Sequence, residues 1–271
     1  MGIHFEIWSS LRAEAEKVAS TEKILAKVLS EYVLERSSLA DALSWRLSSR
    51  LAKGSVPESD LRELIEDCFS NSEQTLLSVV SDLEAVKQRD PACNDLLSPF
   101  MYFKGFQALC AHRVGHQLWL QDRKQLALYL QSLVALVYSV DIHPAAVIGK
   151  GILLDHATGF VAGETCVIED DVSILHEVTL GGTGKERGNR HPKIRSGVLI
   201  GAGAKILGNV EVGQGARVGA SSVVLADVPE SSSVAGVPAK VVGKLVQEEL
   251  PFLGMDHSIE DSRKYENGGG I

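Results

Sequence analysis

Along the first half of the chain, apolar residues recur at the spacing of an α-helix. Ile7, Trp8, Leu11, Ala15 and Val18 fall on one face of a helix with 3.6 residues per turn. Similar stripes continue to about residue 140. Stripes of this width are typical of helices that pack against one another, so residues 1–140 are predicted to form an all-α domain.

Two short polar stretches predict where helices begin. Ser55 and Glu58 have the spacing of a capping box, in which the serine side chain accepts a hydrogen bond from the first turn of the helix. Ser98 followed by Pro99 predicts a second N-cap with proline at the first helical position. That second helix is expected to run on past Phe106 without a break.

After residue 140 the period of the apolar positions changes to six. The members of this series are Ile142, Ile148, Leu154, Phe160, Cys166, Val172, Val178, Ile194, Ile200, Ile206, Val212, Val218 and Val224. Hexapeptide repeats form parallel β-helices, in which six residues give one short strand and one turn, and the recurring aliphatic side chains stack inside. The sequence therefore predicts an α+β protein, with the helical domain followed by a left-handed parallel β-helix over residues 141–243.

The repeat is interrupted once and followed by a different composition. Val178 and Ile194 are not a multiple of six residues apart, so residues near 181–193, GGTGKERGNRHPK, are predicted to form a loop extruded from the β-helix. Loops held by a rigid scaffold often carry function. Residues 244–271 are acidic and Gly-rich, which predicts a flexible C-terminal tail.

Composition and charge narrow the classes of function. The chain of 271 residues is 45% hydrophobic and 23% charged, as expected for a globular protein. A net charge of −8 argues against a nucleic-acid partner. No apolar run is long enough to span a bilayer, and the start MGIHFEIW does not resemble a signal peptide, so no membrane partner and a cytoplasmic location are expected. The four cysteines form no CxxC pair and are expected to be reduced, packed thiols.

The stretch DIHPAAVIGKGILLDHATG, residues 141–159, places two Asp and two His among small and apolar residues. Asp155 and His156 follow the repeat position Leu154, so they are expected at a corner of the β-helix. Asp141 and Asp155 are expected on neighbouring coils and close in space. An imidazole held by a carboxylate is a general base, and no Ser or Cys nucleophile accompanies it. This pattern favours direct attack by the hydroxyl of a bound substrate.

Two other interpretations of these residues stay open. Asp and His side chains at coil corners can simply cap turns. His143, His156, His176 and His191 could also supply three imidazoles to a zinc ion, although no HxxxxH pair spans the relevant turns, and no metal is expected. The segment GGTGKE lacks the glycine and hydroxyl residues of a Walker loop, so a nucleotide-containing ligand would have to lie along the β-helix instead.

The chain resembles a known family over nearly its whole length. The segments that carry the resemblance are RDPAC, KGFQALCAHRVGHQLW, DIHPAAVIGKGILLDHATG, GETCVIEDDVSILHEVTLGGTGK, RHPKI, IGAGAKILGN and AGVPAKVVGK. Together they are similar to the bacterial serine O-acetyltransferases, the hexapeptide-repeat acyltransferases that open cysteine biosynthesis.

The resemblance implies a reaction and roles for particular residues. Acetyl would pass from acetyl-CoA to the hydroxyl of L-serine, giving O-acetyl-L-serine and CoA. His156 would be the general base, and Asp141 would hold its imidazole. The residues that would hold the serine ammonium and carboxylate groups are Asp90, Asp155, Arg190 and His191.

The resemblance also implies ligands and partners. Acetyl-CoA would be a co-substrate and not a permanently bound cofactor, lying between neighbouring β-helices against Gly182, Gly184, Ala202, Ala220 and Lys240. L-cysteine would inhibit by occupying the serine site. The chain would form a homotrimer or a hexamer built as a dimer of trimers. Ile271, at the end of the tail, would bind O-acetylserine sulfhydrylase.

Two alternative functions remain at this point. One is an acetyltransferase for another hydroxyl substrate, such as homoserine or a sugar. The other is a non-catalytic subunit that acts by binding a partner through Ile271. Dependence of turnover on L-serine distinguishes all three.

Overall fold

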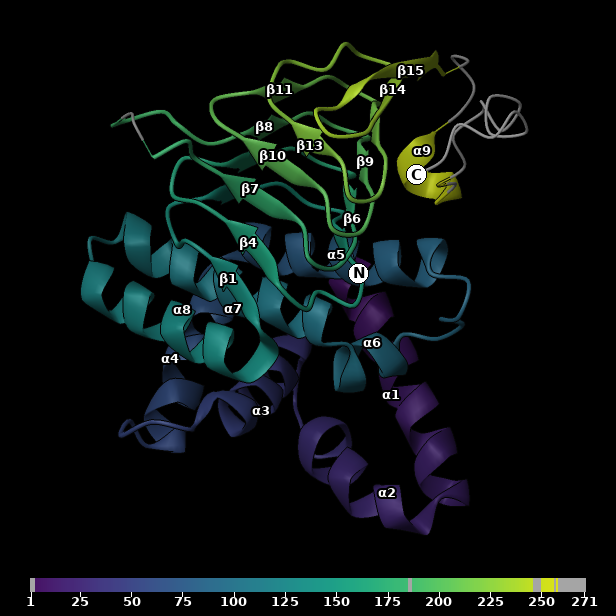
Figure 1. Cartoon of the computed structure of the whole chain (residues 1–271). Coiled ribbons are helices and arrows are strands. Elements are labelled where there is room, and N and C mark those ends of the chain that lie inside the picture. Colours follow the sequence, from purple (N-terminus) through teal and green to yellow (C-terminus); the bar gives the residue numbers. More distant parts are fainter. Residues whose placement is uncertain (1–2, 185–186, 246–249, 256, 258–271) are drawn as a thin grey trace. The chain divides into compact units, whose positions relative to one another are not determined.

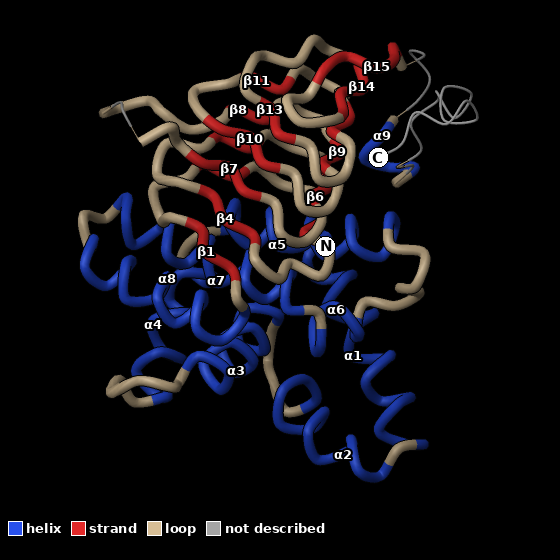
Figure 2. Tube along the Cα trace, in the orientation of Figure 1, coloured by secondary structure: helices blue, strands red, loops and turns tan. Residues whose placement is uncertain are grey.

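The computed structural model describes residues 3–184, 187–245, 250–255 and 257. The chain divides into two compact units, Met1–Val140 and Asp141–Ile271. The described elements of the first unit are helical, whereas the second unit consists mainly of stacked short strands (Figure 1, Figure 2).

The first unit is built from α-helices and one short π-helix. These are α1 (Ile3–Thr21), α2 (Lys23–Leu29), η1 (Ser30–Leu34), α3 (Leu39–Leu51), α4 (Glu58–Ser70), α5 (Glu73–Arg89), α6 (Leu97–Tyr102), α7 (Lys104–Leu120) and α8 (Lys124–Tyr138). Within the described ranges, no helix has both the length and the apolar character needed to cross a membrane.

Helix α7 forms the centre of the first unit, because residues on all its sides are buried from Gly105 to Gly115. It carries one buried charge, that of Arg113. The Nη2 and Nε atoms of Arg113 donate to Oδ2 of Asp82 on α5 at 2.6 and 2.8 Å. The side chain of Asp82 is 1% exposed and that of Arg113 is 7% exposed, so this ion pair belongs to the core.

Both predicted helix starts are wrong in detail. Helix α4 begins at Glu58 after Pro57, and no side chain caps it, so Ser55 does not form a capping box. The second helix begins at Leu97, before Ser98, and breaks at Phe103 into α6 and α7.

Other side chains take over the capping of α6. The carboxylate of Asp95 accepts from the backbone N–H of Ser98 at 2.6 Å. The carboxylate of Glu14, on α1, accepts from the N–H groups of Leu96 and Leu97 at 2.8 and 2.9 Å. A helix start satisfied by a residue more than 80 positions away leaves no local pattern in the sequence.

The second unit is a three-sided parallel β-helix whose strands stack coil on coil. Face A holds β1 (Val140–Ile142), β4 (Phe160–Ala162), β7 (Thr179–Gly181), β10 (Lys205–Leu207) and β13 (Val223–Val224). Face B holds β2 (Val147–Ile148), β5 (Val167–Ile168), β8 (Lys193–Ile194) and β11 (Glu211–Val212). Face C holds β3 (Leu153–Leu154), β6 (Ser173–Ile174), β9 (Leu199–Ile200), β12 (Arg217–Val218), β14 (Ser232–Ala235) and β15 (Lys240–Lys244).

The chain runs from face A to face B to face C in each coil, so three corners repeat along the β-helix. They are called corner AB, corner BC and corner CA after the faces that they join. The last strand, β15, is antiparallel to β14 and ends the stack.

The strand register corrects the predicted stacking in one respect. Leu154 pairs with Ile174 on face C, and Ala162 pairs with Leu180 on face A. The residues Phe160, Cys166, Val172 and Val178 are buried, but they occupy the inward position two residues before the stacking position. The period of six is therefore right, whereas the stacking position moves by two residues after Leu154.

Face C is covered on its outer side by the returning chain. The outward residues of its central strands are buried, including Ser173 and Arg217. Helix α9 (Pro251–Gly254), in the predicted tail, lies along this face, where Oγ of Ser173 donates to the backbone oxygen of Phe252 at 2.9 Å (Figure 1). The four cysteines are free thiols, as expected, and Cys93, Cys110 and Cys166 are buried.

Candidate functional site

The corner that carries His156 is a corner CA, and it has two residues more than the later CA corners of the β-helix. The backbone N–H of Asp155 bonds to Ile174 of the next coil, and the oxygen of Thr158 accepts from Glu177 of that coil. The next coil repeats the second bond, because the oxygen of His176 accepts from the N–H of Gly203. Thr158 therefore has the place in its corner that His176 has in the corner above. The inserted residues are therefore His156 and Ala157.

Both inserted residues adopt the left-handed backbone conformation, with φ of 53° for His156 and 59° for Ala157. Residues other than glycine are rarely found there, and such strain is concentrated at functional sites. Because of the insertion, the His156 side chain projects from the corner and is 74% exposed. The first coil thus needs 20 residues from Leu153 to its partner Ser173, where the sequence predicts 18.

A carboxylate and a second imidazole lie close to the imidazole of His156. Its Nε2 lies 3.8 Å from Oδ2 of Asp155, whose side chain is 25% exposed. The ring of His176, on the next coil, packs edge to face against it with 5.8 Å between centroids. Within the described residues, Nδ1 of His176 is buried without a hydrogen-bond partner.

Asp141 lies on the outer side of face A, at the edge of the β-helix. It is exposed in β1, which neighbours β4, and β4 begins shortly after His156. Asp141 and Asp155 therefore lie at the two ends of the first coil and not on successive coils. The role of Asp141 in holding the imidazole stays a prediction.

Arg190 and His191 lie together at corner AB, one face away from His156. Nη2 of Arg190 donates to Oε2 of Glu164 at 2.8 Å, and this hydrogen bond lowers the pKa of Glu164. Thr165, next to Glu164 in the turn between β4 and β5, accepts at Oγ1 from the backbone N–H groups of Arg190 and His191 at 3.0 and 3.1 Å. The turn below the loop thus holds both loop residues.

The imidazole of His191 is buried at this corner in a defined tautomer. Its Nδ1 accepts from the backbone N–H of Thr165 at 3.2 Å, which leaves Nε2 to carry the proton. Burial, followed by the charge of Arg190, lowers the pKa of His191, so the ring is neutral at pH 7. A Cβ atom on Gly163 would lie 2.0 Å from Nε2 of His191, so only glycine leaves room for the ring.

His143 lies at corner AB too, one coil below Glu164. Its Nδ1 accepts from the N–H of Ala145 at 3.1 Å. Burial lowers the pKa of His143, although the negative charge of Glu164 acts in the other direction and raises it. The four histidines considered for zinc are thus divided between two corners. Among the described residues, no three His, Cys, Asp or Glu side chains are grouped to hold one metal ion.

The residues predicted to contact acetyl-CoA also divide between the corners. Ala202 and Ala220 stack above His176 at corner CA, where the N–H of Ser221 bonds to the oxygen of Ala202 at 2.7 Å. Gly182 lies at corner AB against Arg190 and His191, and Gly184 follows it in the loop with φ of 77°. Lys240 is exposed in β15.

The remaining predicted residues lie elsewhere. Asp90 follows the last residue of α5 in the first unit, and its Oδ1 accepts from the N–H of Ala92 at 2.8 Å. Ile271 lies outside the described residues.

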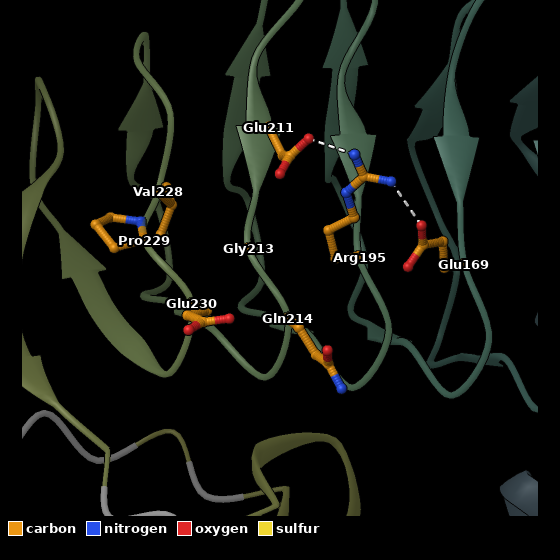
Figure 3. Close-up of a pocket in the computed structure, with 8 residues that line it drawn as sticks. All are labelled: Glu169, Arg195, Glu211, Gly213, Gln214, Val228, Pro229 and Glu230. Atoms are coloured by element: carbon orange, nitrogen blue, oxygen red, sulfur yellow. Dashed lines mark hydrogen bonds and ion pairs between the residues drawn. The ribbon is translucent and has the colours of Figure 1, made fainter.

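Corner BC carries a charged groove of about 390 Å³ that contains none of the predicted site residues. Arg195 lies between Glu169 and Glu211 and bonds to both carboxylates, with 2.7 Å to Oε1 of Glu169 (Figure 3). These bonds raise the pKa of Arg195 and lower that of Glu169. The acidic and basic groups satisfy each other, which is the pattern of a solvent-exposed ion-pair network.

Comparison with known proteins matches both units to one family. Residues 7–111 match the family model described as serine acetyltransferase, N-terminal, and residues 191–226 match the model of the bacterial transferase hexapeptide with six repeats. The chain is 49% identical to the serine acetyltransferase of Escherichia coli K12 over 266 residues, which cover 98% of this chain and 97% of the relative. The chain belongs to the serine acetyltransferase family.

Solved structures of this family share the fold. A serine acetyltransferase in complex with cysteine is 48% identical, with a TM-score of 0.92, and the match covers 94% of this chain and 99% of that one. The serine acetyltransferase of Brucella abortus in complex with coenzyme A is 48% identical, with a TM-score of 0.87, and the match covers 89% and 96%. The predicted resemblance is thereby confirmed, as are the helical domain followed by a left-handed parallel β-helix and the assignment to the acyltransferases.

For a serine acetyltransferase, the sequence did not point to Glu164 and Thr165 as neighbours of predicted site residues, and His176 was considered only as a zinc ligand. Glu164 and Thr165 hold Arg190 and His191, and His176 packs on His156. Glu164 and Thr165 directly follow Gly163 in the corner below the extruded loop. If the extruded loop is aligned with the same corner of the preceding coil, these two residues fall directly below it.

Proposed function

We propose that this chain transfers the acetyl group of acetyl-CoA to the hydroxyl of L-serine, giving O-acetyl-L-serine and CoA. The observation that carries the proposal is the 49% identity to a serine acetyltransferase over 98% of the chain. It is supported by the exposed imidazole of His156 on a two-residue insertion beside a carboxylate.

In the proposed reaction His156 is the general base. It takes the proton of the serine hydroxyl while the oxygen attacks the thioester carbon of acetyl-CoA, and it returns a proton to the sulfur as the carbon–sulfur bond breaks. No covalent enzyme intermediate forms, because the substrate hydroxyl attacks directly. Asp141 is proposed to hold the imidazole.

Serine is a zwitterion, so its two ends need opposite charges around them. Asp155, 3.8 Å from His156, is proposed to receive the ammonium group together with Asp90. Arg190 and the Nε2–H of His191 are proposed to hold the carboxylate and to face the developing oxyanion.

These two groups of residues cannot act on one serine within a single β-helix. The stretch from Thr158 to Gly163 crosses face A, and five steps of extended chain span about 16 Å. A serine molecule with a hydrogen bond at each end is much shorter. We therefore infer that corner CA of one copy meets corner AB of a neighbouring copy, which agrees with a homotrimer, or with a hexamer formed from two trimers.

Acetyl-CoA is proposed to bind as a co-substrate along the same junction. Ala202 and Ala220 continue the corner of His156 along the β-helix, and their small side chains leave room for an extended ligand beside the backbone. Gly182 and Gly184 would approach the ligand from the neighbouring copy, and Lys240 would lie near its phosphates. A related enzyme with coenzyme A bound supports this class of ligand.

Regulation and partners are proposed on the same basis. L-cysteine differs from serine only by sulfur in place of oxygen, and a related serine acetyltransferase is solved in complex with cysteine. We propose that L-cysteine inhibits this chain at the serine site. O-acetylserine sulfhydrylase is the proposed partner of Ile271, and the cytoplasm is the proposed location.

The proposed function is tested by the substrate dependence of CoA release. The purified chain is incubated with acetyl-CoA and with L-serine, homoserine or a sugar, and free thiol is measured. Thiol release that depends on L-serine and rises well above that with the other hydroxyl compounds is expected. Equal turnover with homoserine would contradict the proposal. A chain that binds its partner but releases no thiol with L-serine would contradict it as well.

A further inference from the structure

The short turn between β4 and β5 contacts the extruded loop through two consecutive side chains. Glu164 bonds to the guanidinium of Arg190, as described above. Thr165 makes a denser set of contacts, because both its hydroxyl and its backbone N–H take part. The residues on the other side of these contacts are the two that the proposed function assigns to the serine carboxylate.

The hydroxyl of Thr165 is saturated with hydrogen bonds. Its oxygen accepts from the N–H groups of Arg190 and His191 at 3.0 and 3.1 Å, and it lies 2.9 Å from Nδ1 of His191. With both acceptor positions used, its hydrogen points to Nδ1. The backbone N–H of Thr165 lies 3.2 Å from the same nitrogen. Two donors, this N–H and the hydroxyl, therefore face Nδ1.

Two donors on Nδ1 have a chemical consequence for His191. A proton on Nδ1 would face both of them, so the neutral ring carries its proton on Nε2 and can offer it to an anion. Burial lowers the pKa of His191, which keeps the ring neutral and agrees with this arrangement.

We propose that Thr165 is a positioning residue for serine binding, which fixes the Nε2–H tautomer of His191 and the backbone that presents Arg190. This inference rests on the proposed function of Arg190 and His191 as the carboxylate site. Thr165 does not touch the substrate in this proposal. It acts through the two loop residues.

A second anchor of the same loop provides a matched control. Nζ of Lys193 donates to the backbone oxygens of Thr165 and His191 at 2.6 and 2.8 Å and to Oδ1 of Asn189 at 2.6 Å. No contact of Lys193 involves the ring of His191 among the hydrogen bonds described. Lys193→Met therefore loosens the base of the loop but leaves the donors on Nδ1 in place.

The test compares Thr165→Val, which keeps the shape of the side chain but removes the hydroxyl, with Thr165→Ser, which keeps the hydroxyl. In Thr165→Val, the backbone N–H groups of Arg190 and His191 lose their acceptor and Nδ1 of His191 loses a donor. We expect the KM for L-serine to rise tenfold or more, with a smaller fall in kcat, the KM for acetyl-CoA to stay within about threefold, and Thr165→Ser to stay within about threefold of the wild type. We expect Lys193→Met to raise the KM for serine less than Thr165→Val does.

Three results would overturn the role of Thr165. These are an unchanged KM for serine in Thr165→Val, a fall in kcat alone, or an equal effect of Lys193→Met, which would make Thr165 only a loop anchor. If Thr165→Val does not assemble, Thr165→Ala replaces it in the same comparison. Absence of serine-dependent turnover in the wild type would instead count against the proposed function.

A second measurement does not depend on turnover. The ¹⁵N spectrum of histidine-labelled protein, assigned with His191→Gln, reports which ring nitrogen carries the proton. The proton is expected on Nε2 in the wild type and in Thr165→Ser. In Thr165→Val the backbone N–H of residue 165 is the donor that remains on Nδ1, so Nε2 is expected to stay the main site of the proton and a minor Nδ1–H population is expected to emerge. An Nδ1–H ring in the wild type would overturn the proposal by itself.

Discussion

Replacing His156 with alanine is expected to lower kcat for serine acetylation by about 100- to 10,000-fold, the range contributed by a positioned general base. The exposed ring sits on a two-residue insertion that the later CA corners lack, so its removal should leave the stacked coils intact. Initial rates of thiol release at saturating L-serine and acetyl-CoA measure the loss.

A second variant separates base catalysis from packing. His156→Asn keeps a polar side chain of similar size beside Asp155 but cannot take a proton at neutral pH. It is expected to be as inactive as the alanine variant, while the mass of the assembly and its melting temperature stay at wild-type values. Retention of more than about a tenth of the wild-type kcat in either variant would show that another group is the base.

The second large effect is expected on stability, at the buried pair of Asp82 and Arg113. In Asp82→Ala, the guanidinium of Arg113 keeps its charge in the core without its carboxylate, which is expected to lower the free energy of unfolding by about 3–5 kcal/mol. Trp8, Trp45 and Trp119 are the three tryptophans of the chain, and all lie in the helical unit. Tryptophan fluorescence during urea unfolding therefore follows that unit.

The control removes both charges. Asp82→Leu combined with Arg113→Met fills the site with apolar side chains, and it is expected to restore most of the lost stability, because neither charge of the pair is left buried without the other. If the double variant were as unstable as Asp82→Ala, or if Asp82→Ala cost less than about 1 kcal/mol, the destabilisation could not be assigned to an unpaired buried charge.

The period of six was enough to predict the β-helix, because each side of each coil has one inward aliphatic residue. This repeat is visible in the sequence even when the exact strand register is not known. The same regularity concealed the insertion at His156. Phe160 is apolar and six residues after Leu154, so the series continues unbroken in the sequence, yet Phe160 fills the other inward position and Ala162 is the residue that stacks. Both inward positions accept apolar side chains, so composition alone could not show the change of register.

The helix starts could not be predicted where the partner is distant in sequence. Ser98–Pro99 has the local pattern of a cap, but the carboxylate of Glu14 satisfies the N–H groups of Leu96 and Leu97. Tertiary contacts thus moved the start of α6 and allowed the break at Phe103. Such contacts follow from packing and not from propensity.

In the candidate site, too, contacts between sequence neighbours were predictable and contacts between distant residues were not. Asp155 and His156 are neighbours in sequence and were expected together, and the structure has them 3.8 Å apart. Arg190 and His191 were expected on the extruded loop, but their separation from His156 by a whole face of the β-helix depends on which strands begin and end at each corner. Thr165 was missed because its importance comes from stacking below the loop.

The central claim is that one active site combines His156 of one copy with Arg190 and His191 of a neighbour, and mixing two inactive variants tests it most directly. His156→Ala and Arg190→Ala are each expected to be inactive as pure assemblies. In assemblies formed from equal amounts of both, about a quarter of the sites of a cyclic oligomer join an intact His156 to an intact Arg190, so activity should recover to about a quarter of the wild-type value. A mixture that stays as inactive as its two parents, although mass measurement shows mixed assemblies, would contradict a site shared between copies.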